Sequence, residues 1–343
     1  MTLHITDPLT DDRWNDLLRH HPMASAFHQR GWLHALSRTY GYEPLVLTST
    51  PPGPPLHDGI VLCRVSSWIT GTRLVSLPFA DHCEPLLGDP GDLPEFTAWL
   101  TEESKGKRHK YFEMRPLFPR DASCGMQPSR SYYFHTLDLR PGLEQLFRDL
   151  HKDSIQRKIR RAKRENLSYE VGSSERLLQD FYRLVLMTRK RLKTLPQPRS
   201  WFTNLLRYMG ANLEIRVARH DGAAIAALLS LGHGSSVIYK YGCSDKRFHN
   251  LGAMPFLFWK LIEESKAAGA TQLDFGRTDL GNEGLSTFKN RFGTTRRLLT
   301  YYRYPGPEKA DSAMNSRSMQ QLFSLLPDAV SYAAGRVLYR HMG

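Results

Sequence analysis

The clearest alternation of apolar and polar positions lies in the second half of the chain. Three strands are predicted there, at residues 213–219, 223–231 and 237–242. Glycine-containing turns separate these strands, because glycine tolerates the positive φ that a tight turn requires. Apolar spacing then predicts a helix over residues 253–268, ended by Gly269, and a fourth strand over residues 271–275.

The first third of the chain predicts a mixture of strands and helices. Helices are expected at residues 27–40 and 92–104, where apolar side chains recur at helical spacing. Strands are expected at residues 44–48, 59–65, 74–77, 110–114 and 132–139. The Pro-Pro-Gly-Pro-Pro segment at residues 51–55 predicts an exposed loop, since proline cannot donate to a ladder.

A long amphipathic helix is predicted to start near Pro141, with one apolar stripe that continues to Ala162. Its other faces carry the candidate polyanion-binding residues Arg157, Lys158, Arg160, Arg161, Lys163 and Arg164. A second basic cluster, residues 189–193, follows another amphipathic stretch, residues 177–187. These charges either keep a surface helix solvated or bind phosphates, and the two clusters serve one ligand only if they converge in space.

Composition adds a bias toward anionic partners. The chain has 343 residues, enough for two domains, and a formal net charge of +13 that favours nucleic acid, anionic headgroups or phosphorylated precursors. The four cysteines show no CxxC spacing, so neither a disulfide framework nor a zinc site is expected. No basic leader or apolar span is visible, and the expected location is the cytoplasm.

Three segments in the second half resemble one known family. They are residues 239–244 (Tyr-Lys-Tyr-Gly-Cys-Ser), 273–278 (Leu-Asp-Phe-Gly-Arg-Thr) and 284–293 (Gly-Leu-Ser-Thr-Phe-Lys-Asn-Arg-Phe-Gly). Their order and character resemble the FemAB family of the GNAT superfamily, including acyltransferases of bacterial exopolysaccharide loci. Residues 157–171 resemble the basic helix and strand that open the family's second domain, and residues 27–32 and 77–79 resemble landmarks of its first.

The resemblance implies an α+β protein with two tandem GNAT-like domains. The first domain would span residues 1–140, with residues 305–343 packing back on it. The second, residues 141–304, would carry the donor and catalytic site in a splayed mixed sheet. No long heptad insertion is visible, so the chain resembles the family members that lack a coiled-coil arm.

The loop before the helix at 253–268 is the candidate site for the donor's phosphates. GNAT proteins that use coenzyme A usually carry Arg/Gln-x-x-Gly-x-Gly/Ala there, and this chain has Arg247, Asn250 and Gly252 at those positions. A side chain at Asn250 crowds a close approach of the backbone to a pyrophosphate. This departure weakens the coenzyme A interpretation and agrees with the FemAB side of the superfamily.

Acyl transfer to an amine needs a neutral amine, a held carbonyl and stabilisation of the oxyanion, without a covalent nucleophile. Lys289 matches the lysine of the family's Phe-Lys element and is the first candidate for a catalytic role, the alternative being an exposed helix lysine. Asp274 and Asp279 are candidates for holding or deprotonating the attacking ammonium. A desolvated carboxylate is needed for the second task.

Further residues are candidates for substrate contacts. The set is Arg277, Tyr239, Tyr241, Phe288, Asp81 and His82. Tyr239 and Tyr241 alternate along a strand and should face one side of it, where they either line an acyl pocket or pack in the core. Residues 81–84, Asp-His-Cys-Glu, are consecutive and cannot all converge on one ion, so no metal site is expected.

Three functions remain compatible with the sequence. The first is transfer of an aminoacyl group from aminoacyl-tRNA to an amine of a cell-wall or related precursor. The second is acyl-CoA-dependent N- or O-acylation in exopolysaccharide or glycolipid synthesis, with peripheral contact at the inner membrane face. The third is a non-catalytic nucleic-acid-binding protein. In the first two the donor, aminoacyl-tRNA or acyl-CoA, is a co-substrate, and no cofactor is expected.

Overall fold

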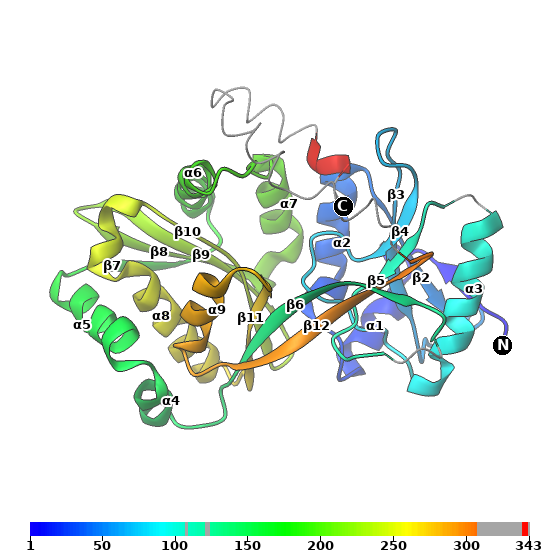
Figure 1. Ribbon diagram of the computed structural model, residues 1–343, viewed down its shortest axis with the longest axis horizontal. Helices are drawn as coiled ribbons and strands as arrows, with labels where there is room; N and C mark the ends of the chain where they lie inside the picture. Colours follow the sequence, from blue (N-terminus) through cyan, green and yellow to red (C-terminus); the bar gives the residue numbers. More distant parts are fainter. Residues whose placement is uncertain (107–108, 121–123, 307–337, 342–343) are drawn as a thin grey trace. The chain divides into compact units, whose positions relative to one another are not determined.

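The computed structural model of the chain describes residues 1–106, 109–120, 124–306 and 338–341. They form two compact units, which are described separately (Figure 1). Unit 1 contains residues 1–132, 299–306 and 338–341, and unit 2 contains residues 133–298. The chain passes between the units inside two strands, β6 (Gln127–Asp138) and β12 (Thr295–Tyr304). The domain boundaries expected from the family resemblance were residues 140 and 304. The spacing of apolar residues also predicts a helix that begins at Pro327 and reaches Leu338; it lies outside the described residues, apart from its last position.

Unit 1 is a sheet with helices. Its elements are β1 (His4–Thr6), α1 (Asp12–His20), α2 (Arg30–Tyr40), β2 (Glu43–Thr48), β3 (Ile60–Val65), β4 (Arg73–Ser76), α3 (Leu93–Gly106) and β5 (Phe112–Met114). The strands lie in the order β1-β2-β3-β4-β5-β12. Neighbours are antiparallel except for β4 and β5, which are parallel. Apolar side chains of β2–β5 pack against α3 to form a core.

Unit 2 contains the segment whose pattern was clearest. Its helices are α4 (Leu143–Asp149), α5 (Arg157–Arg164), α6 (Glu175–Arg191), α7 (Arg199–Met209), α8 (Ala253–Ala267) and α9 (Glu283–Asn290). Its further strands are β7 (Ser168–Gly172), β8 (Leu213–His220), β9 (Ala223–His233), β10 (Ser236–Ser244) and β11 (Gln272–Asp279). The predicted succession of three strands, a helix and a strand is confirmed, in the sheet order β6-β11-β10-β9-β8-β7.

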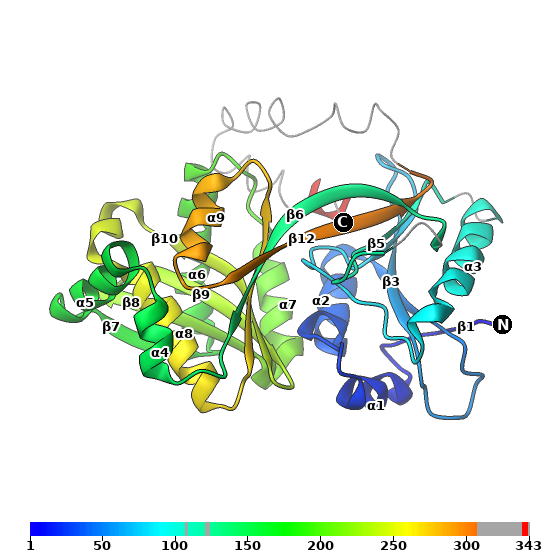
Figure 2. The same ribbon diagram turned by 60° about the horizontal axis from the view of Figure 1, so that its bottom comes forward.

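Helices cover both faces of the strands of unit 2. Figure 1 shows α6 on one side of β7–β10 and α8 on the other, and Figure 2 shows α4, α5 and α8 gathered on one side. The apolar faces of these three helices share one buried core with β9 and β11. This packing fixes the strand ends that carry the candidate residues. No helix in the described part of the chain has the length and apolarity needed to cross a bilayer.

The single long helix expected from Pro141 onward is wrong. The structure has α4, then a π-helical turn at Lys152–Gln156, then α5. Leu150 is extended (ψ 139°), and the N–H of His151 leaves the helical ladder to donate to the carbonyl of Arg291 (2.9 Å). The apolar stripe persists across the break because the buried residues on both sides face the same core. Hydrophobic spacing alone could not reveal this interruption.

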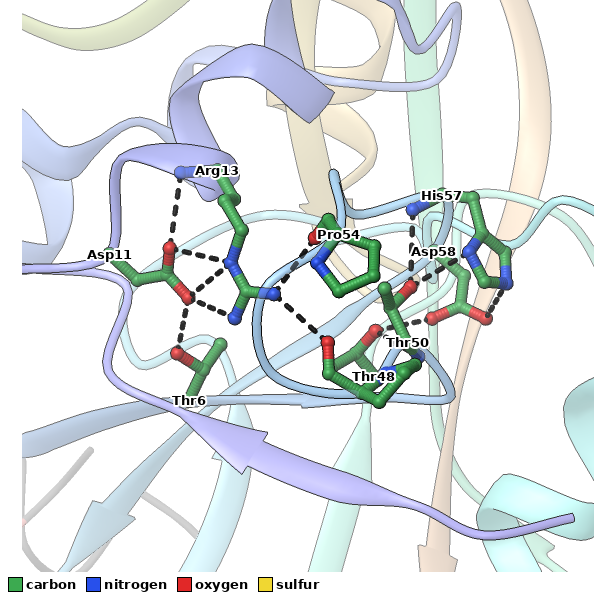
Figure 3. A network of polar contacts seen from close by, with 9 residues as sticks. Thr6, Asp11, Arg13, Thr48, Thr50, Pro54, His57 and Asp58 are labelled. Atoms are coloured by element: carbon green, nitrogen blue, oxygen red, sulfur yellow. Dashed lines mark hydrogen bonds and ion pairs between the residues drawn. The ribbon is translucent and has the colours of Figure 1, made fainter.

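The proline-rich loop of unit 1 is exposed, as predicted, and polar side chains anchor it (Figure 3). Arg13 donates to the carbonyls of Pro51 (3.1 Å) and Pro54 (2.9 Å), and its guanidinium pairs with Asp11 (2.7 Å). On the other side of the loop, the buried carboxylate of Asp58 accepts from Thr48 (2.7 Å). The prolines provide no donors, so the side chains around the loop hold its carbonyls.

This network predicts a pH-dependent contribution to stability. Hydrogen bonds from Arg13 lower the pKa of Asp11 from 3.8 to about 2. A lowered carboxyl pKa stabilises the fold above 3.8, and this contribution disappears as the pH falls toward 2. We expect Asp11→Asn to reduce the unfolding free energy by about 1–2 kcal/mol at pH 6. Denaturant unfolding between pH 6 and 2.5 should show the gap to wild type closing; the matched control is Asp16→Asn, an exposed ion pair on α1. A gap that is independent of pH would contradict this assignment.

Candidate active site

The sheet of unit 2 opens between β10 and β11. The two strands pair in parallel from Ser236 to Ile238 and from Gln272 to Asp274. Both strands continue beyond that point, but the pairing between them ends there. On its other side, β10 shifts register against β9 between Tyr239 and Tyr241. The strands therefore splay where the candidate residues lie.

A bulge in β11 brings Asp274 and Lys289 onto one short stretch of backbone. Gly276 has φ +71°, and its N–H donates to the carboxylate of Asp274. The ammonium of Lys289, on α9, donates to the carbonyls of Gly276 (3.0 Å) and Arg277 (2.9 Å). Successive carbonyls of an extended strand point in opposite directions, so two that converge on one ammonium require the left-handed glycine. Lys289 was predicted as a catalytic candidate from the family's Phe-Lys element, and the sequence did not predict the bulge that it contacts.

Lys289 is not an exposed helix lysine. Its side chain is 3% exposed, and Asp274 is 2% exposed. A buried ammonium is stable only where hydrogen bonds compensate its desolvation, and the two carbonyls provide that compensation. Because each peptide is planar and trans, carbonyls that face Lys289 turn the N–H groups of Arg277 and Thr278 to the opposite side. Lys289 thus determines the orientation of the bulge.

The remaining candidates on and after β11 lie nearer the surface. Arg277 is half-buried and Asp279 is exposed at the end of the strand, where its carbonyl accepts from Asn282. Phe288 of α9 packs against Phe258 and Phe292, at ring separations of 5.7 and 5.2 Å, and belongs to the edge of the core. The structure thus brings Asp274, Arg277 and Lys289 together and leaves Asp279 in a turn.

The expectation that Tyr239 and Tyr241 face one side of their strand is wrong. Tyr239 packs against Phe258 of α8 (4.6 Å), whereas the hydroxyl of Tyr241 accepts from Trp201 of α7 (2.9 Å). The register shift between them inserts one residue, Lys240, and so reverses the alternation of side chains. Both tyrosines are half-buried, and only Tyr239 lies on the face that carries α8.

One buried histidine near Lys289 was not predicted. His135 of β6 is fully buried, and its Nε2 lies 3.4 Å from the hydroxyl of Ser286 on α9. Burial, followed by the charges of Lys289 and Arg296, lowers the pKa of His135 to about 4, so the imidazole is neutral at pH 7. It lies in a segment of alternating residues that reads as an ordinary strand, so the sequence gives no signal for it.

The candidate phosphate loop is a 3₁₀ turn, Lys246–Leu251, that leads into α8. Arg247 and Asn250 are exposed there, and Arg247 pairs with the buried carboxylate of Asp245 (2.6 Å). Gly252 is the N-cap of α8 and has φ +79°. Next to its Cα lies the backbone carbonyl of Lys158, so the glycine is required by the packing of α5 and by its own dihedral angle.

Substituting this glycine should therefore be costly whatever the loop binds. A Cβ at Gly252 would clash with the carbonyl of Lys158, and α5 would have to move away from α8. We expect Gly252→Ala to lower the unfolding free energy by about 2–3 kcal/mol. The matched control is Gly281→Ala, where an added Cβ meets nothing within 4 Å. Urea unfolding of the two variants checks this expectation, and equal midpoints would refute it.

The two basic clusters converge on this loop. From the end of α6, Arg191 donates to the carbonyl of Ser244 (2.9 Å) and lies 3.5 Å from Nε2 of His249. Burial, then the positive charges of Arg191 and Lys158, lower the pKa of His249. Both cations can lower the pKa of this imidazole only if they lie close to it. Cations from α5, α6 and the loop therefore surround the start of α8, where the helix dipole also favours anions.

The basic face of α5 is mostly open to solvent. Ile159 and Ala162 are its buried residues, and Arg161 is partly neutralised by Glu165 (3.3 Å). The exposed basic residues are Arg157, Lys158, Arg160, Lys163 and Arg164. Arg160 also lies over the ring of Phe147, 5.7 Å from its centroid. The polyanion-binding candidates thus form one exposed face of a helix whose other side is buried.

Asp81 and His82 belong to unit 1. They lie in a loop after β4 that is held by Arg115, which donates to the carbonyl of Leu77 (2.6 Å), and by Tyr301, which donates to the carbonyl of Asp81 (2.6 Å). Asp81 is half-buried and His82 is buried, with its ring 5.3 Å from that of Phe27. The loop presents a fixed backbone. No group of His, Cys, Asp and Glu among the described residues is arranged to hold a metal ion.

Comparison with known proteins places unit 2 in a class. Residues 150–290 match the family model described as an acetyltransferase (GNAT) domain. No curated protein sequence matches the chain. Among solved structures the chain is similar to FemX, with a TM-score of 0.70 and 14% identity over 89% of this chain and 97% of that one.

Two further structures share the fold. One is the C-terminal domain of a putative lysylphosphatidylglycerol synthetase from Agrobacterium fabrum, with a TM-score of 0.58 and 16% identity over 88% of this chain and 93% of that one. The other is a tandem GNAT protein from the clavulanic acid biosynthesis pathway, with a TM-score of 0.54 and 13% identity over 90% and 100%.

Residues 150–290 therefore carry a GNAT-type acyltransferase domain, a class whose members bind an acyl donor and an acceptor. The fold of the chain is similar to those of FemX and of a tandem GNAT protein. The expected α+β fold with tandem GNAT-like domains, which the FemAB-like resemblance implied, is therefore confirmed.

Proposed function

We propose that this protein transfers an aminoacyl group from aminoacyl-tRNA to an amine of a cell-wall or related precursor. The observation that carries the proposal lies at the start of α8. Arg191 of α6 lies 3.5 Å from His249, and the backbone of Lys158 of α5 packs on Gly252, next to the turn that contains Lys246. Three cations from three elements suit a ligand with several phosphates, and the exposed basic face of α5 extends the positive surface beyond one pyrophosphate.

The chemistry would be direct attack of the amine on the donor carbonyl. The carbonyl would lie in the opening between β10 and β11, beside the bulge that Lys289 and Asp274 hold. Lys289 would stabilise the oxyanion through its charge and through the N–H groups that it orients. Asp274 already binds the backbone N–H of Gly276, which favours a positioning role over proton abstraction. The C–N bond of the new amide forms as the ester C–O bond to the tRNA ribose breaks; the amine gives up one proton to solvent or to a carboxylate, and the departing ribose oxygen takes one proton from solvent.

Acyl-CoA is the second candidate donor. It is supported by the match of residues 150–290 to an acetyltransferase model and by the exposed Arg247 at the entrance of α8. The acceptor would then belong to exopolysaccharide or glycolipid synthesis, at the cytoplasmic face of the inner membrane. Asn250 in the position of the middle glycine counts against this donor, because its side chain lies on the exposed loop surface that a pyrophosphate would approach.

The salt dependence of binding distinguishes aminoacyl-tRNA from acyl-CoA as the donor. Purified protein is titrated with charged tRNA, and separately with acetyl-CoA, at several salt concentrations. We expect tRNA binding to weaken steeply with salt, and the double variant Lys158→Gln/Arg191→Gln to reduce the slope of log K against log [salt] by about 1–2. The matched control is Arg19→Gln/Lys105→Gln, which removes two exposed cations from unit 1.

Each outcome has a distinct meaning. Saturable micromolar binding of acetyl-CoA without tRNA binding would replace the first donor with the second. Tight tRNA binding without transfer to any amine acceptor would favour the third function, a non-catalytic nucleic-acid-binding protein. If the double variant kept the wild-type salt slope, the start of α8 would not be the phosphate site.

A further inference from the structure

A short segment from the end of the chain docks on unit 1. Tyr339–His341 forms a 3₁₀ turn, and its contacts lie about 270 residues earlier in the sequence. Nδ1 of His341 lies 2.9 Å from the hydroxyl of Ser67, and its carbonyl accepts from Arg73 (2.9 Å) and Thr70 (3.2 Å). The hydroxyl of Tyr42 donates to the carbonyl of Tyr339 (3.2 Å).

The receiving surface is held by hydrogen bonds of its own. The hydroxyl of Ser67 accepts from the N–H groups of Ile69 and Thr70, which shapes the turn between β3 and β4. Arg73 is 2% exposed and also donates to the hydroxyl of Thr70 (2.6 Å). This fixed guanidinium is aimed at the carbonyl of His341. A buried guanidinium needs hydrogen-bond acceptors in place of water, and the carbonyl of His341 is one of the acceptors of Arg73.

Aromatic rings form the second wall of this surface. Tyr40, Tyr42 and Phe79 pack together, at ring separations of 5.0 to 6.3 Å, and the ring of Tyr339 lies 5.8 Å from Phe79. On the opposite side, Trp68 meets His341 edge to face at 5.7 Å, although Trp68 itself is 86% exposed. Trp68 therefore gives the segment one ring contact and leaves the rest of its surface to solvent.

We propose that Tyr42, Ser67, Thr70, Arg73 and Phe79, here called the tail socket, form a peptide-docking site whose ligand is the chain's own segment Tyr339–His341. Main-chain carbonyls of the segment accept hydrogen bonds from Arg73, Thr70 and Tyr42. Its tyrosine ring packs on Phe79, and its imidazole contacts the hydroxyl of Ser67. Four hydrogen bonds and two rings give a modest free energy, so docking is reversible. The proposal does not depend on the donor or the acceptor of the transfer reaction.

Docking should weaken in acid. His341 is 5% exposed, and burial, followed by the charges of Arg340 and Arg73, lowers its pKa from 6.5. The docked segment therefore holds a neutral imidazole, and the released one protonates more readily. Docking is fully favoured above pH 6.5 and is progressively lost below it. The charged groups that face the ring are Arg73 from β4 and Arg340 from the segment itself.

Hydrogen exchange on the intact protein tests the docked state. We expect His341→Ala to lower the protection factors of amides in residues 67–73 at least tenfold at pH 7.5, with the remaining strands of unit 1 unchanged. Wild-type protein at pH 5.5 should lose protection in the same amides, by less than the variant does. Unchanged protection in His341→Ala at pH 7.5 would overturn the proposal. So would a loss that extends to β1–β3 as a whole, since the segment would then be a structural part of the unit.

Binding in trans tests recognition by the tail socket. The probe is a fluorescent hexapeptide with the sequence of residues 338–343, titrated at pH 7.5 into full-length His341→Ala protein, whose socket is expected to be open. We expect saturable binding that is at least tenfold weaker for wild type, whose own tail competes at a high effective concentration. Adding Arg73→Gln should weaken binding at least tenfold. If that variant does not fold, Thr70→Val removes a donor from the socket turn instead. No peptide binding to the His341→Ala protein would overturn the proposal.

Discussion

Replacing Lys289 by methionine is expected to reduce transferase turnover by about 10²-fold or more. Methionine retains most of the volume of the buried side chain but removes the ammonium from the carbonyls of Gly276 and Arg277. The bulge of β11 then loses the charge that holds its two carbonyls, and the peptide N–H groups on its other side lose their fixed orientation. Removing one oxyanion-stabilising donor typically costs about 10²–10³-fold in turnover.

The measurement is single-turnover transfer from the donor identified by the binding experiments, with folding checked by circular dichroism and urea unfolding. Arg291→Gln is the matched control, since it removes an exposed positive charge two residues away. Wild-type turnover in a folded Lys289→Met protein would remove this lysine from the proposed site. An equal loss in Arg291→Gln would point to general electrostatics instead of the bulge.

Replacing Arg216 by alanine is expected to cause a large loss of stability in unit 2. This guanidinium is 2% exposed and reaches Glu264 (2.9 Å), Glu214 (2.6 Å) and the hydroxyl of Ser230 (2.7 Å). It thereby connects β8, β9 and α8. Only the guanidinium is buried, since the side chains of Glu214 and Glu264 are 49% and 35% exposed. Its removal leaves an empty site and the buried hydroxyl of Ser230 without this donor, while water can solvate the carboxylates, so the expected cost is about 2–3 kcal/mol.

Urea unfolding measures this loss, with Arg207→Ala on the exposed side of α7 as the matched control. The double variant Arg216→Met/Glu264→Gln should recover part of the stability, because it removes the carboxylate together with its partner. A loss of less than about 1 kcal/mol for Arg216→Ala would show that solvent replaces the guanidinium and that the network is not essential.

The strands of unit 2 could be predicted because burial is one-sided or complete along each of them. β8 alternates, and β9 is apolar because helices cover both of its faces, so pattern and position agree. The break between α4 and α5 could not be predicted, because the apolar stripe continues across it although the backbone leaves the helical conformation there. Helix α7 and strand β12 were also missed. Strand β12 carries Arg296, Arg297 and Arg303, charges that mask its alternation and lie over aromatic rings.

Only part of the candidate site could be predicted from the sequence. Lys289 and Asp274 came from a motif, and the structure adds what the motif cannot express: both act on the backbone of Gly276. The reversal between Tyr239 and Tyr241 depends on a register shift, which neighbouring strands determine and local sequence does not. His135 becomes notable only through its burial beside Lys289 and Ser286. Tertiary contacts, not residue types, define these features.

The pairing of β5 with β12 has a consequence for biosynthesis. Met114 pairs with Tyr302, so the edge of an N-terminal strand is completed by residues that leave the ribosome after all of unit 2. Until then the edge of β5 is an unpaired template for other strands. The middle of the chain can become compact first, while the nascent N-terminal part waits for its last strand and is the segment most in need of a chaperone during synthesis.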